Sequence, residues 1–531
     1  MPLETAINQI QALVRLCIDN GREITNCLER LQQAGVQDIA TSKFATLFEQ
    51  LEAEILFLAD TSHHLSDSLV VHLMRLLQRL GGILHSASTS LTMYAENAHM
   101  LALSFSGSSM KESMDLVDDV ENVVQQVEVW HSAFLQRLFL IVLLGEPFST
   151  MSPAQNSGYQ RSKALREVFN LRQAISQAKN VRNLPLLEIA SITAPRDRLQ
   201  DSQIWTAKND NGNAFIIEYK ETDEAVELPV LKASIRDLMT VLSQADPLRM
   251  GILCGFGFSR IQSDRRNGFE LAYKFPDGHS NPRTLRNILL DPVNARKGPL
   301  HSITDRCTLA HWLARAVLYI HATGNVHKSV RPETILIFEK EESGDRDRYP
   351  YAIGSAYLVG LDGLRRDGPY STLTSDGEWN KDIYRHPTRQ GLDPKKVYSM
   401  RHDVYSLGVV LLEIALWRPF LYWNGSVYTL DEGMSRTFLT KSVSKTELSG
   451  GFDKWGNKLK SANDIHASLI KAAKQQVPLS MGSKFAKLVV QCLECLNGSF
   501  AISGDVENED QVDVGIRYIE VVLEKLESIS M

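Results

Sequence analysis

Residues 309–338 read LAHWLARAVLYIHATGNVHKSVRPETILIF, and this stretch decides the expected fold. Its first part has the apolar spacing of an amphipathic helix. Gly324 then marks a turn, a short polar loop follows, and the closing ILIF is an apolar run typical of a strand. The stretch therefore predicts a helix, a loop and a strand in immediate succession.

The loop in this stretch closely resembles the catalytic loop of protein kinases, whose pattern is His-Arg-Asp-Leu-x-x-x-Asn. The spacing is kept, with His327-Lys328-Ser329 at the His-Arg-Asp positions, Arg331-Pro332 at the usual Lys-Pro, and Thr334 at the metal-binding Asn. The resemblance implies that His327, Arg331 and Pro332 support the fold. It also implies that Ser329 and Thr334 stand where catalytic groups would be.

Two later segments match kinase landmarks in the expected order. Residues 400–414 read MRHDVYSLGVVLLEI, which looks like the kinase stretch of Asp, x, Tyr or Trp, Ser, x, Gly followed by an apolar helix. There Asp403 would begin a buried helix and accept backbone hydrogen bonds from the catalytic loop, which is a structural role. Residues 384–388 (YRHPT) resemble the end of the activation segment, with Thr388 in place of the Glu of Ala-Pro-Glu. Three signals in the right order and spacing are much more specific than one alone.

Strand-like runs first appear after Leu184 and precede the kinase-like loop, at residues 204–207, 214–219, 250–256 and 269–275. Strands followed by a largely helical remainder predict a two-lobed α+β domain. The run FIIEYK ends in Lys220, like the kinase motif Val-Ala-Ile-Lys. The resemblance implies that Lys220 contacts the α- and β-phosphates of ATP and pairs with an acid on the next helix, for which Asp237 is the candidate.

Departures from the kinase pattern decide the expected function. Phosphoryl transfer uses a catalytic-loop Asp to accept the hydroxyl proton, and an Asn and the Asp of Asp-Phe-Gly to hold magnesium. Ser329 offers no carboxylate, and Thr334 is a poorer ligand than Asn for a hard cation. Residues 193–212 contain one glycine, at the end, where a phosphate-binding loop needs several. ATP with magnesium is the cofactor that the resemblance implies, but these residues support nucleotide binding only weakly.

The region that matches Asp-Phe-Gly allows two alignments, because residues 357–365 read YLVGLDGLR. In the favoured alignment Gly360, Leu361 and Asp362 stand at the three positions, since the apolar Leu361 fills the aromatic slot. A register shifted by two instead makes Asp362 the metal ligand, with Gly363 after it. Asp362 is therefore a candidate metal and nucleotide ligand, and Gly360 a degenerate catalytic position.

Four amphipathic segments occupy the N-terminal part of the chain, from Pro2 to about Leu31, Ser42 to about Leu58, about Leu65 to Leu91, and about Met110 to Leu144. Such segments with short connections predict an antiparallel helical bundle. We therefore predict a multidomain chain that begins with an all-α helical bundle (1–147) and continues with a linker and bracing helix (148–183). A two-lobed α+β protein-kinase-like fold follows, with a small lobe (184–280) and a large lobe (281–531).

Composition is that of an ordinary globular protein. Residues 1–147 hold 18 Asp and Glu against eight Lys and Arg, which disfavours nucleic acid and anionic lipid as partners. The six cysteines show no secreted-framework spacing, and no apolar stretch is long enough to span a membrane. We expect an intracellular, cytoplasmic location, with peripheral membrane recruitment as the less favoured alternative.

The kinase-like part is similar to a divergent group of kinase-like domains found in fungal multidomain proteins, where helical HeLo-type modules precede them. The domain order is also similar to that of the mixed lineage kinase domain-like family of cell-death executioners. These resemblances imply a catalytically impaired pseudokinase in signalling or scaffolding, whose bundle binds other proteins or self-associates. Two alternatives stay open: an atypical active ATP-dependent Ser/Thr protein kinase that uses Asp362, and a membrane-active executioner controlled by its pseudokinase domain.

Overall fold

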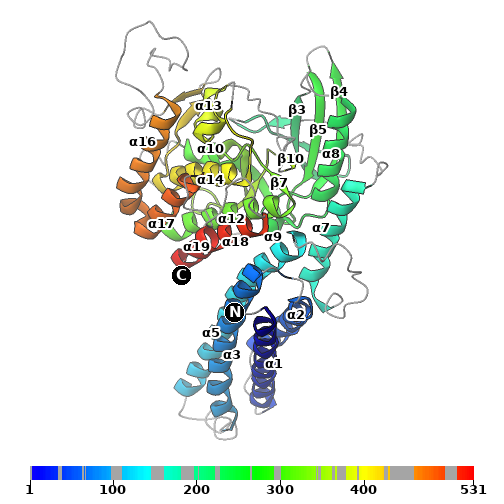
Figure 1. Ribbon diagram of the computed structural model, residues 1–531, viewed down its shortest axis with the longest axis vertical. Coiled ribbons are helices and arrows are strands. Elements are labelled where there is room, and N and C mark those ends of the chain that lie inside the picture. The colour runs from blue at the N-terminus through cyan, green and yellow to red at the C-terminus, as the bar shows by residue number, and fades with distance from the viewer. Residues whose placement is uncertain are drawn as a thin grey trace. The chain divides into compact units, whose positions relative to one another are not determined.

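The structure, a computed structural model, describes residues 3–33, 39–62, 65, 67–96, 110–144, 161–180, 196–200, 202–221, 228–263, 266–291, 301–341, 344, 348–360, 365–366, 378–391, 394–423, 428–430, 460–496 and 511–530. The chain divides into two compact units, Met1–Arg172 and Gln173–Met531. The division falls inside helix α7 (Lys163–Asn180), within the segment predicted as a linker and bracing helix. An N-terminal helical region is followed by an α+β region, as the sequence predicted (Figure 1).

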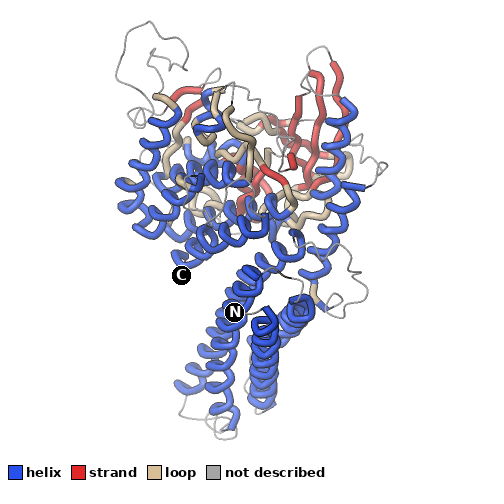
Figure 2. Tube along the Cα trace, viewed as in Figure 1, coloured by secondary structure: helices blue, strands red, loops and turns tan. Residues whose placement is uncertain are grey.

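The N-terminal unit is helical wherever it is described (Figure 2). Its helices are α1 (Leu3–Gln33), α2 (Ile39–Thr61), α3 (Asp67–Glu96), α5 (Met110–Leu144) and the first part of α7. Helix α1 packs on α2 and α3, and α5 packs on α2 and α3. Each helix buries an apolar stripe in the shared core, and this removal of apolar surface from water is the main stabilising term.

Close packing of α1 against α2 depends on Gly21. A Cβ atom at this position would lie 1.9 Å from Cε2 of Phe48. The Phe48 ring therefore occupies the space that any larger residue at position 21 would need.

Glu54 is a fully buried carboxylate in the helical region. Its Oε2 lies 2.6 Å from His131 Nε2, and its Oε1 accepts a hydrogen bond from Ser162 Oγ at 2.6 Å. Ser162 Oγ also accepts the N–H of Leu165 at 3.1 Å, which caps the start of α7. The carboxylate, rather than the imidazole, contacts the serine, so this is a structural tie between α2, α5 and α7 rather than a nucleophilic triad.

The small lobe of the C-terminal unit is an antiparallel sheet with one main helix. Its elements are β1 (Asp197–Arg198), β2 (Trp205–Lys208), β3 (Ala214–Glu221), α8 (Leu228–Leu242), α9 (Pro247–Met250), β4 (Gly255–Ser263) and β5 (Arg266–Lys274), and the strand order is β1-β2-β3-β5-β4. Gly255 allows α8 to approach the sheet, because a Cβ there would lie 3.0 Å from Cβ of Leu242. Successive residues of β3 alternate between the two faces, so Ile216, Glu218 and Lys220 share one of them.

The large lobe is mainly helical. Its helices are α10 (Leu285–Leu289), α12 (Ile303–Ala322), η4 (Pro332–Thr334), α13 (Trp379–Asp382), η7 (Pro387–Arg389), α14 (Met400–Leu416), α16 (Ala462–Gln475), α17 (Val477–Leu493), α18 (Gln511–Tyr518), η10 (Ile519–Leu523) and α19 (Glu524–Ser530). Its strands are β6 (His279–Thr284), β7 (Asn325–Val326), β8 (Ile335–Lys340), β9 (Ser355–Leu358), β10 (Arg365–Arg366), β11 (Leu421–Trp423) and β12 (Tyr428–Leu430). Helix α14 is buried from Met400 to Ala415 and forms the centre of the lobe. None of the described helices of either unit is both long enough and apolar enough to cross a membrane.

Candidate functional site

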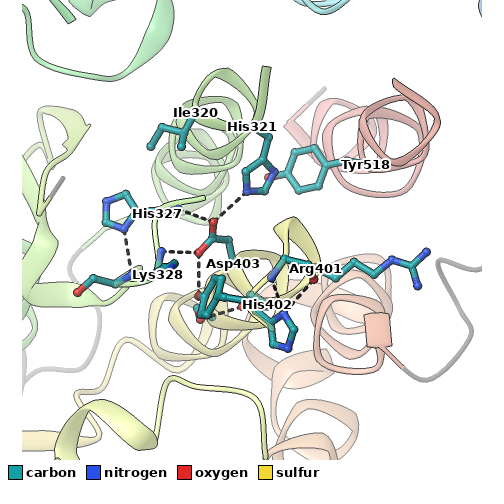
Figure 3. Close-up of polar contacts among 12 residues, drawn as sticks. Ile320, His321, His327, Lys328, Arg401, His402, Asp403 and Tyr518 are labelled. Atoms are coloured by element: carbon teal, nitrogen blue, oxygen red, sulfur yellow. Dashed lines mark hydrogen bonds and ion pairs between the residues drawn. The ribbon is translucent and has the colours of Figure 1, made fainter. Parts of the chain in front are cut away.

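Asp403 is a fully buried carboxylate in the first turn of α14. Its Oδ2 accepts hydrogen bonds from the backbone N–H of His327 at 2.7 Å and from His321 Nε2 at 3.0 Å. Its Oδ1 accepts the backbone N–H of Lys328 and the hydroxyl of Tyr398, each at 2.9 Å. Figure 3 shows His321 reaching Asp403 from α12, while the loop that carries His327 and Lys328 approaches it from the other side.

Two of these donors decide the charge state of Asp403. Burial alone would raise the pKa of the carboxyl group, but the hydrogen bonds from His321 and from the backbone N–H of His327, together with the electrostatic effect of the two imidazoles, outweigh it. The pKa therefore lies below its ordinary value, and Asp403 is ionised. Lys328, whose backbone N–H donates to Asp403, has a φ of +67°, a left-handed conformation that is unfavourable for a lysine. The buried carboxylate thus fixes a strained loop.

The His327 side chain joins this loop to the segment that contains Gly360. Its Nδ1 accepts the backbone N–H of Ser329 at 3.2 Å, which leaves the proton on Nε2. Nε2 then donates to the carbonyl oxygen of Val359 at 2.8 Å. His327 therefore positions both the residue that replaces the catalytic base and the residue that precedes Gly360.

Thr334 uses its hydroxyl inside the loop. Its Oγ1 lies 2.6 Å from the carbonyl oxygen of Ser329 and 2.9 Å from that of Arg331, and it accepts the N–H of Arg331 at 3.2 Å. Pro332 is buried at the start of η4, which ends at Thr334. The hydroxyl at the expected metal position is thus engaged by the backbone that surrounds it.

Gly360 is fitted to Thr334. Its φ is +82°, and a Cβ atom on it would lie 2.5 Å from Cγ2 of Thr334. Both the backbone conformation and the contact exclude an aspartate at position 360. Leu361 and Asp362 lie outside the described residues, so the role of Asp362 as a metal or nucleotide ligand stays a prediction.

Glu218 is the residue of β3 that reaches this site, and sequence reasoning missed it. Its side chain is 5% exposed, Oε1 accepts the backbone N–H of Gly360, and Oε2 accepts the hydroxyl of Tyr273 at 3.0 Å. Lys220, the predicted phosphate-binding residue, lies two positions further along the same face and is half-buried opposite Phe269. The apolar run of the strand ends at Ile217. Aligning residues 215–218 (FIIE) with Val-Ala-Ile-Lys, instead of residues 217–220 (IEYK), would have pointed to Glu218.

Asp237, the predicted partner of Lys220, lies on α8 and is a quarter exposed. Its carboxylate forms an ion pair with the guanidinium of its neighbour Arg236 at 3.1 Å. The cation that neutralises Asp237 is therefore supplied from its own helix.

Among the residues that the structure describes, the groups at this site do not fit magnesium and ATP. A phosphate chain needs cations and N–H donors, whereas the buried Glu218 carboxyl group already accepts the N–H of Gly360. Within the described ranges, no group of three or more His, Cys, Asp or Glu side chains is arranged to hold a metal ion. The contacts of Asp403, His327 and Thr334 hold the backbone of the loop in place.

A second buried charge cluster lies beside the loop, around Arg286 of α10. The guanidinium is fully buried and lies 3.0 Å from Oε1 of Glu333 and 3.0 Å from Oε1 of Glu413. It also donates to the hydroxyl of Tyr384, which in turn donates to Glu413 Oε2 at 3.0 Å. Burial raises the pKa of Glu413, whereas for Glu333 the charges of Arg286 and Arg331 and the hydrogen bonds of the carboxylate together outweigh burial and lower the pKa. One cation thus joins α10, the kinase-like loop, the segment before η7 and α14.

Thr388, which replaces the Glu of Ala-Pro-Glu, connects two buried histidines. Its N–H donates to His386 Nδ1 at 3.2 Å, and its hydroxyl oxygen lies 2.9 Å from that nitrogen and 3.2 Å from His402 Nε2. His402 Nδ1 accepts the N–H of Ser399 at 3.0 Å. Burial and the neighbouring positive charges lower the pKa of His386 to about 4 and that of His402 to about 3. Both rings are therefore neutral at neutral pH.

Acidification is expected to destabilise the protein through His386. Its folded-state pKa lies below the ordinary 6.5, so its contribution to stability is complete above pH 6.5 and is lost as the pH falls to about 4. The loss amounts to roughly 3 kcal/mol by pH 4. Urea unfolding at pH 7, 6, 5 and 4 measures it, with His386→Asn as the test variant because Asn Oδ1 can replace Nδ1 as an acceptor.

The free-energy difference between wild type and His386→Asn should narrow, or reverse, as the pH falls. The same substitution at exposed His85 serves as the control and should leave the pH profile unchanged. Parallel profiles for wild type and His386→Asn would show that His386 does not titrate in this range.

Comparisons with known proteins do not identify a family for this chain. No family model and no curated protein matches the chain. A chain of the CAK complex from Chaetomium thermophilum bound to ATP-γ-S is similar to 61% of this chain and covers 90% of its own length, with 13% identity and a TM-score of 0.35. The antiparallel small lobe, the helical large lobe and the loop anchored on Asp403 are features of the structure itself. The C-terminal unit therefore has a protein-kinase-like fold.

Proposed function

We propose that the C-terminal unit is a pseudokinase, which acts in signalling or scaffolding by binding other proteins rather than by transferring phosphate. The observation that carries the proposal is the contact of the buried Glu218 carboxylate with the N–H of Gly360. The oxygens of this carboxyl group accept hydrogen bonds and, when ionised, repel the phosphates of a nucleotide, so Glu218 occupies the N–H of Gly360 without offering the cation that phosphates need. Neither Ser329 nor Thr334 supplies the missing carboxylate or amide.

The groups that hold the loop support the same proposal. Asp403, His327 and Arg286 are buried and fully engaged, and none of their contacts needs a nucleotide. A fold that keeps its rigid framework without its chemical groups is suited to presenting a surface. We further propose that the N-terminal helical region is the interaction module that binds a partner protein or a second copy of the chain. Its net charge of −10 over residues 1–147 argues against an anionic membrane as the partner.

The purified full-length protein is expected to show no thermal stabilisation by ATP with magnesium and no phosphate transfer to itself or to general protein substrates. A ligand at 100 times its Kd would stabilise the protein by about 2.7 kcal/mol, so binding would be visible in a thermal shift assay. Glu218→Gln tests the charge, because it keeps the shape and removes the anion. In Glu218→Gln, ATP with magnesium should stabilise the protein more than it stabilises wild type, while phosphate transfer should still be absent.

A substitution of Lys220 tests for the result that would contradict the proposal. Phosphate transfer that is abolished by Lys220→Met would contradict the proposal and favour an active kinase. Lys208→Met, a matched change at an exposed lysine of the neighbouring strand β2, is the control and should leave any such activity intact.

A further inference from the structure

A pocket of about 580 Å³ lies between α16, α17 and α19, in the large lobe and away from the loop anchored on Asp403. Figure 1 shows these helices beside one another near the C-terminus. Four lysines line the pocket, namely Lys474, Lys484, Lys487 and Lys525, and none of the other described residues that line it is acidic. This volume is within the usual range of small-molecule sites.

The positive charge of the pocket is only partly neutralised. Lys474 lies 3.8 Å from Glu494, and Lys525 donates to the side-chain oxygen of Gln491. Lys484 donates to the carbonyl oxygen of Ser528 at 3.4 Å. Among the residues that the structure describes, neither Lys484 nor Lys487 has a carboxylate within ion-pairing distance.

Lys525 is partly buried, and burial lowers the pKa of its ammonium group. Cys492 opposes this shift, while repulsion from the nearby positive charges of Arg517 and Lys487 lowers the pKa by smaller amounts. Two nearby acids are engaged elsewhere, because Glu527 of α19 lies 3.7 Å from His311 and Glu520 of the preceding η10 pairs with Arg517 at 3.6 Å. An anion in the pocket would remove this repulsion.

The walls of the pocket indicate the rest of the ligand. Pro478, Ala486 and Val490 line it together with the aliphatic stems of the lysines, and the lining that the structure describes contains no aromatic residue on which a base or ring could stack. An apolar wall of small side chains suits a flexible aliphatic group. Lysine ammonium groups at its edge suit a carboxylate or a phosphate.

We propose that this pocket binds an organic anion with an aliphatic chain, whose carboxylate or phosphate head lies among Lys484, Lys487 and Lys525. The head could belong to a free acid or to a lipid in a membrane, and both present the same chemistry to the pocket. The proposal is independent of phosphate transfer, because none of these residues contacts the kinase-like loop.

The test is isothermal titration of the full-length protein with octanoate and with octyl phosphate, alongside octanol as a neutral probe of the same chain length. Saturable one-to-one binding of an anion, with no binding of octanol, is the expected result. Lys487→Glu should weaken it at least tenfold, because the new carboxylate repels the head group. Lys471→Glu, an exposed lysine of α16 that does not line the pocket, is the matched control and should bind like wild type.

Co-sedimentation with phosphatidate vesicles distinguishes a membrane lipid from a free acid as the source of the anionic head group. Vesicle binding that Lys487→Glu abolishes and Lys471→Glu preserves would identify a membrane lipid, whereas binding of soluble anions alone would identify a free acid. Val490→Phe, which fills the pocket without a change of charge, should block either ligand. No binding of any probe, or binding that Lys487→Glu and Val490→Phe leave unchanged, would overturn the proposal.

Discussion

Asp403→Asn is expected to lower the free energy of unfolding of the C-terminal unit by about 3–5 kcal/mol. The carboxylate accepts four hydrogen bonds in a site with no exposure to water, two of them from the backbone of a strained loop. Asparagine keeps the shape but loses the charge and puts an N–H donor against donors that now lack an acceptor. Urea unfolding followed by tryptophan fluorescence measures the loss, since all but one of the seven tryptophans follow residue 200.

A local measurement accompanies the global one. Amide hydrogen exchange at His327 and Lys328 should become faster in Asp403→Asn, because their N–H groups lose their acceptor. Asp305→Asn, in the exposed capping box of α12, is the matched control and should change stability by less than about 1 kcal/mol. If Asp403→Asn were no more harmful than this control, Asp403 would not be the anchor of the loop.

Sequence reasoning succeeded where the signal is local. The helix, turn, loop and strand of residues 309–338 follow from apolar spacing and a glycine, and they appear as α12, β7, η4 and β8. The N-terminal helices follow from the 3.6-residue spacing of their apolar residues in the same way. Periodicity of this kind reports which face of an element is buried, and burial of that face is what stabilises the element.

Side chains brought together by tertiary packing could not be found in that way. Glu218 contacts the N–H of Gly360 across 142 positions of the chain, and Arg286 contacts Glu413 across 127 positions. The fit between Gly360 and the Thr334 methyl group depends on a positive φ that a sequence does not display. A strand motif read from its final lysine selected Lys220, whose role stays a prediction, and gave no sign that Glu218 on the same face of β3 contacts Gly360.

The lysine pocket was missed for a related reason. Its residues come from three helices, and each lysine alone reads as a solvated surface charge. Only the packing of α17 against α16 and α19 shows that four of these charges share one concave, partly apolar space. Single-helix patterns carry no information on such convergence.

Arg286→Met is the second substitution with a large expected effect, a loss of about 3–5 kcal/mol in the free energy of unfolding at pH 7. Methionine can fill the volume of the side chain but leaves Glu333 and Glu413 buried together without a cation. Urea unfolding of the full-length protein, followed by tryptophan fluorescence, measures the loss.

The pH dependence of this loss distinguishes charge from packing. In wild type Arg286 holds the pKa of Glu333 below its ordinary 4.5, so that contribution to stability is present above pH 4.5 and is lost as the pH falls. Without Arg286 the pKa of both carboxyl groups rises, and the folded variant takes up protons before the unfolded chain does. The difference in stability between wild type and Arg286→Met should therefore shrink as the pH is lowered from 7 towards 5.

The triple variant Arg286→Met, Glu333→Gln, Glu413→Gln completes the argument. Replacing a buried ion cluster by neutral groups of similar volume is often nearly neutral, whereas removing one partner is not. The triple variant should therefore recover most of the stability lost in Arg286→Met and should do so equally at pH 7 and pH 5. If it remained as unstable as the single variant at both values, the role of Arg286 would be the packing of its side chain rather than its charge, because the uncompensated carboxylates would no longer be there to account for the loss.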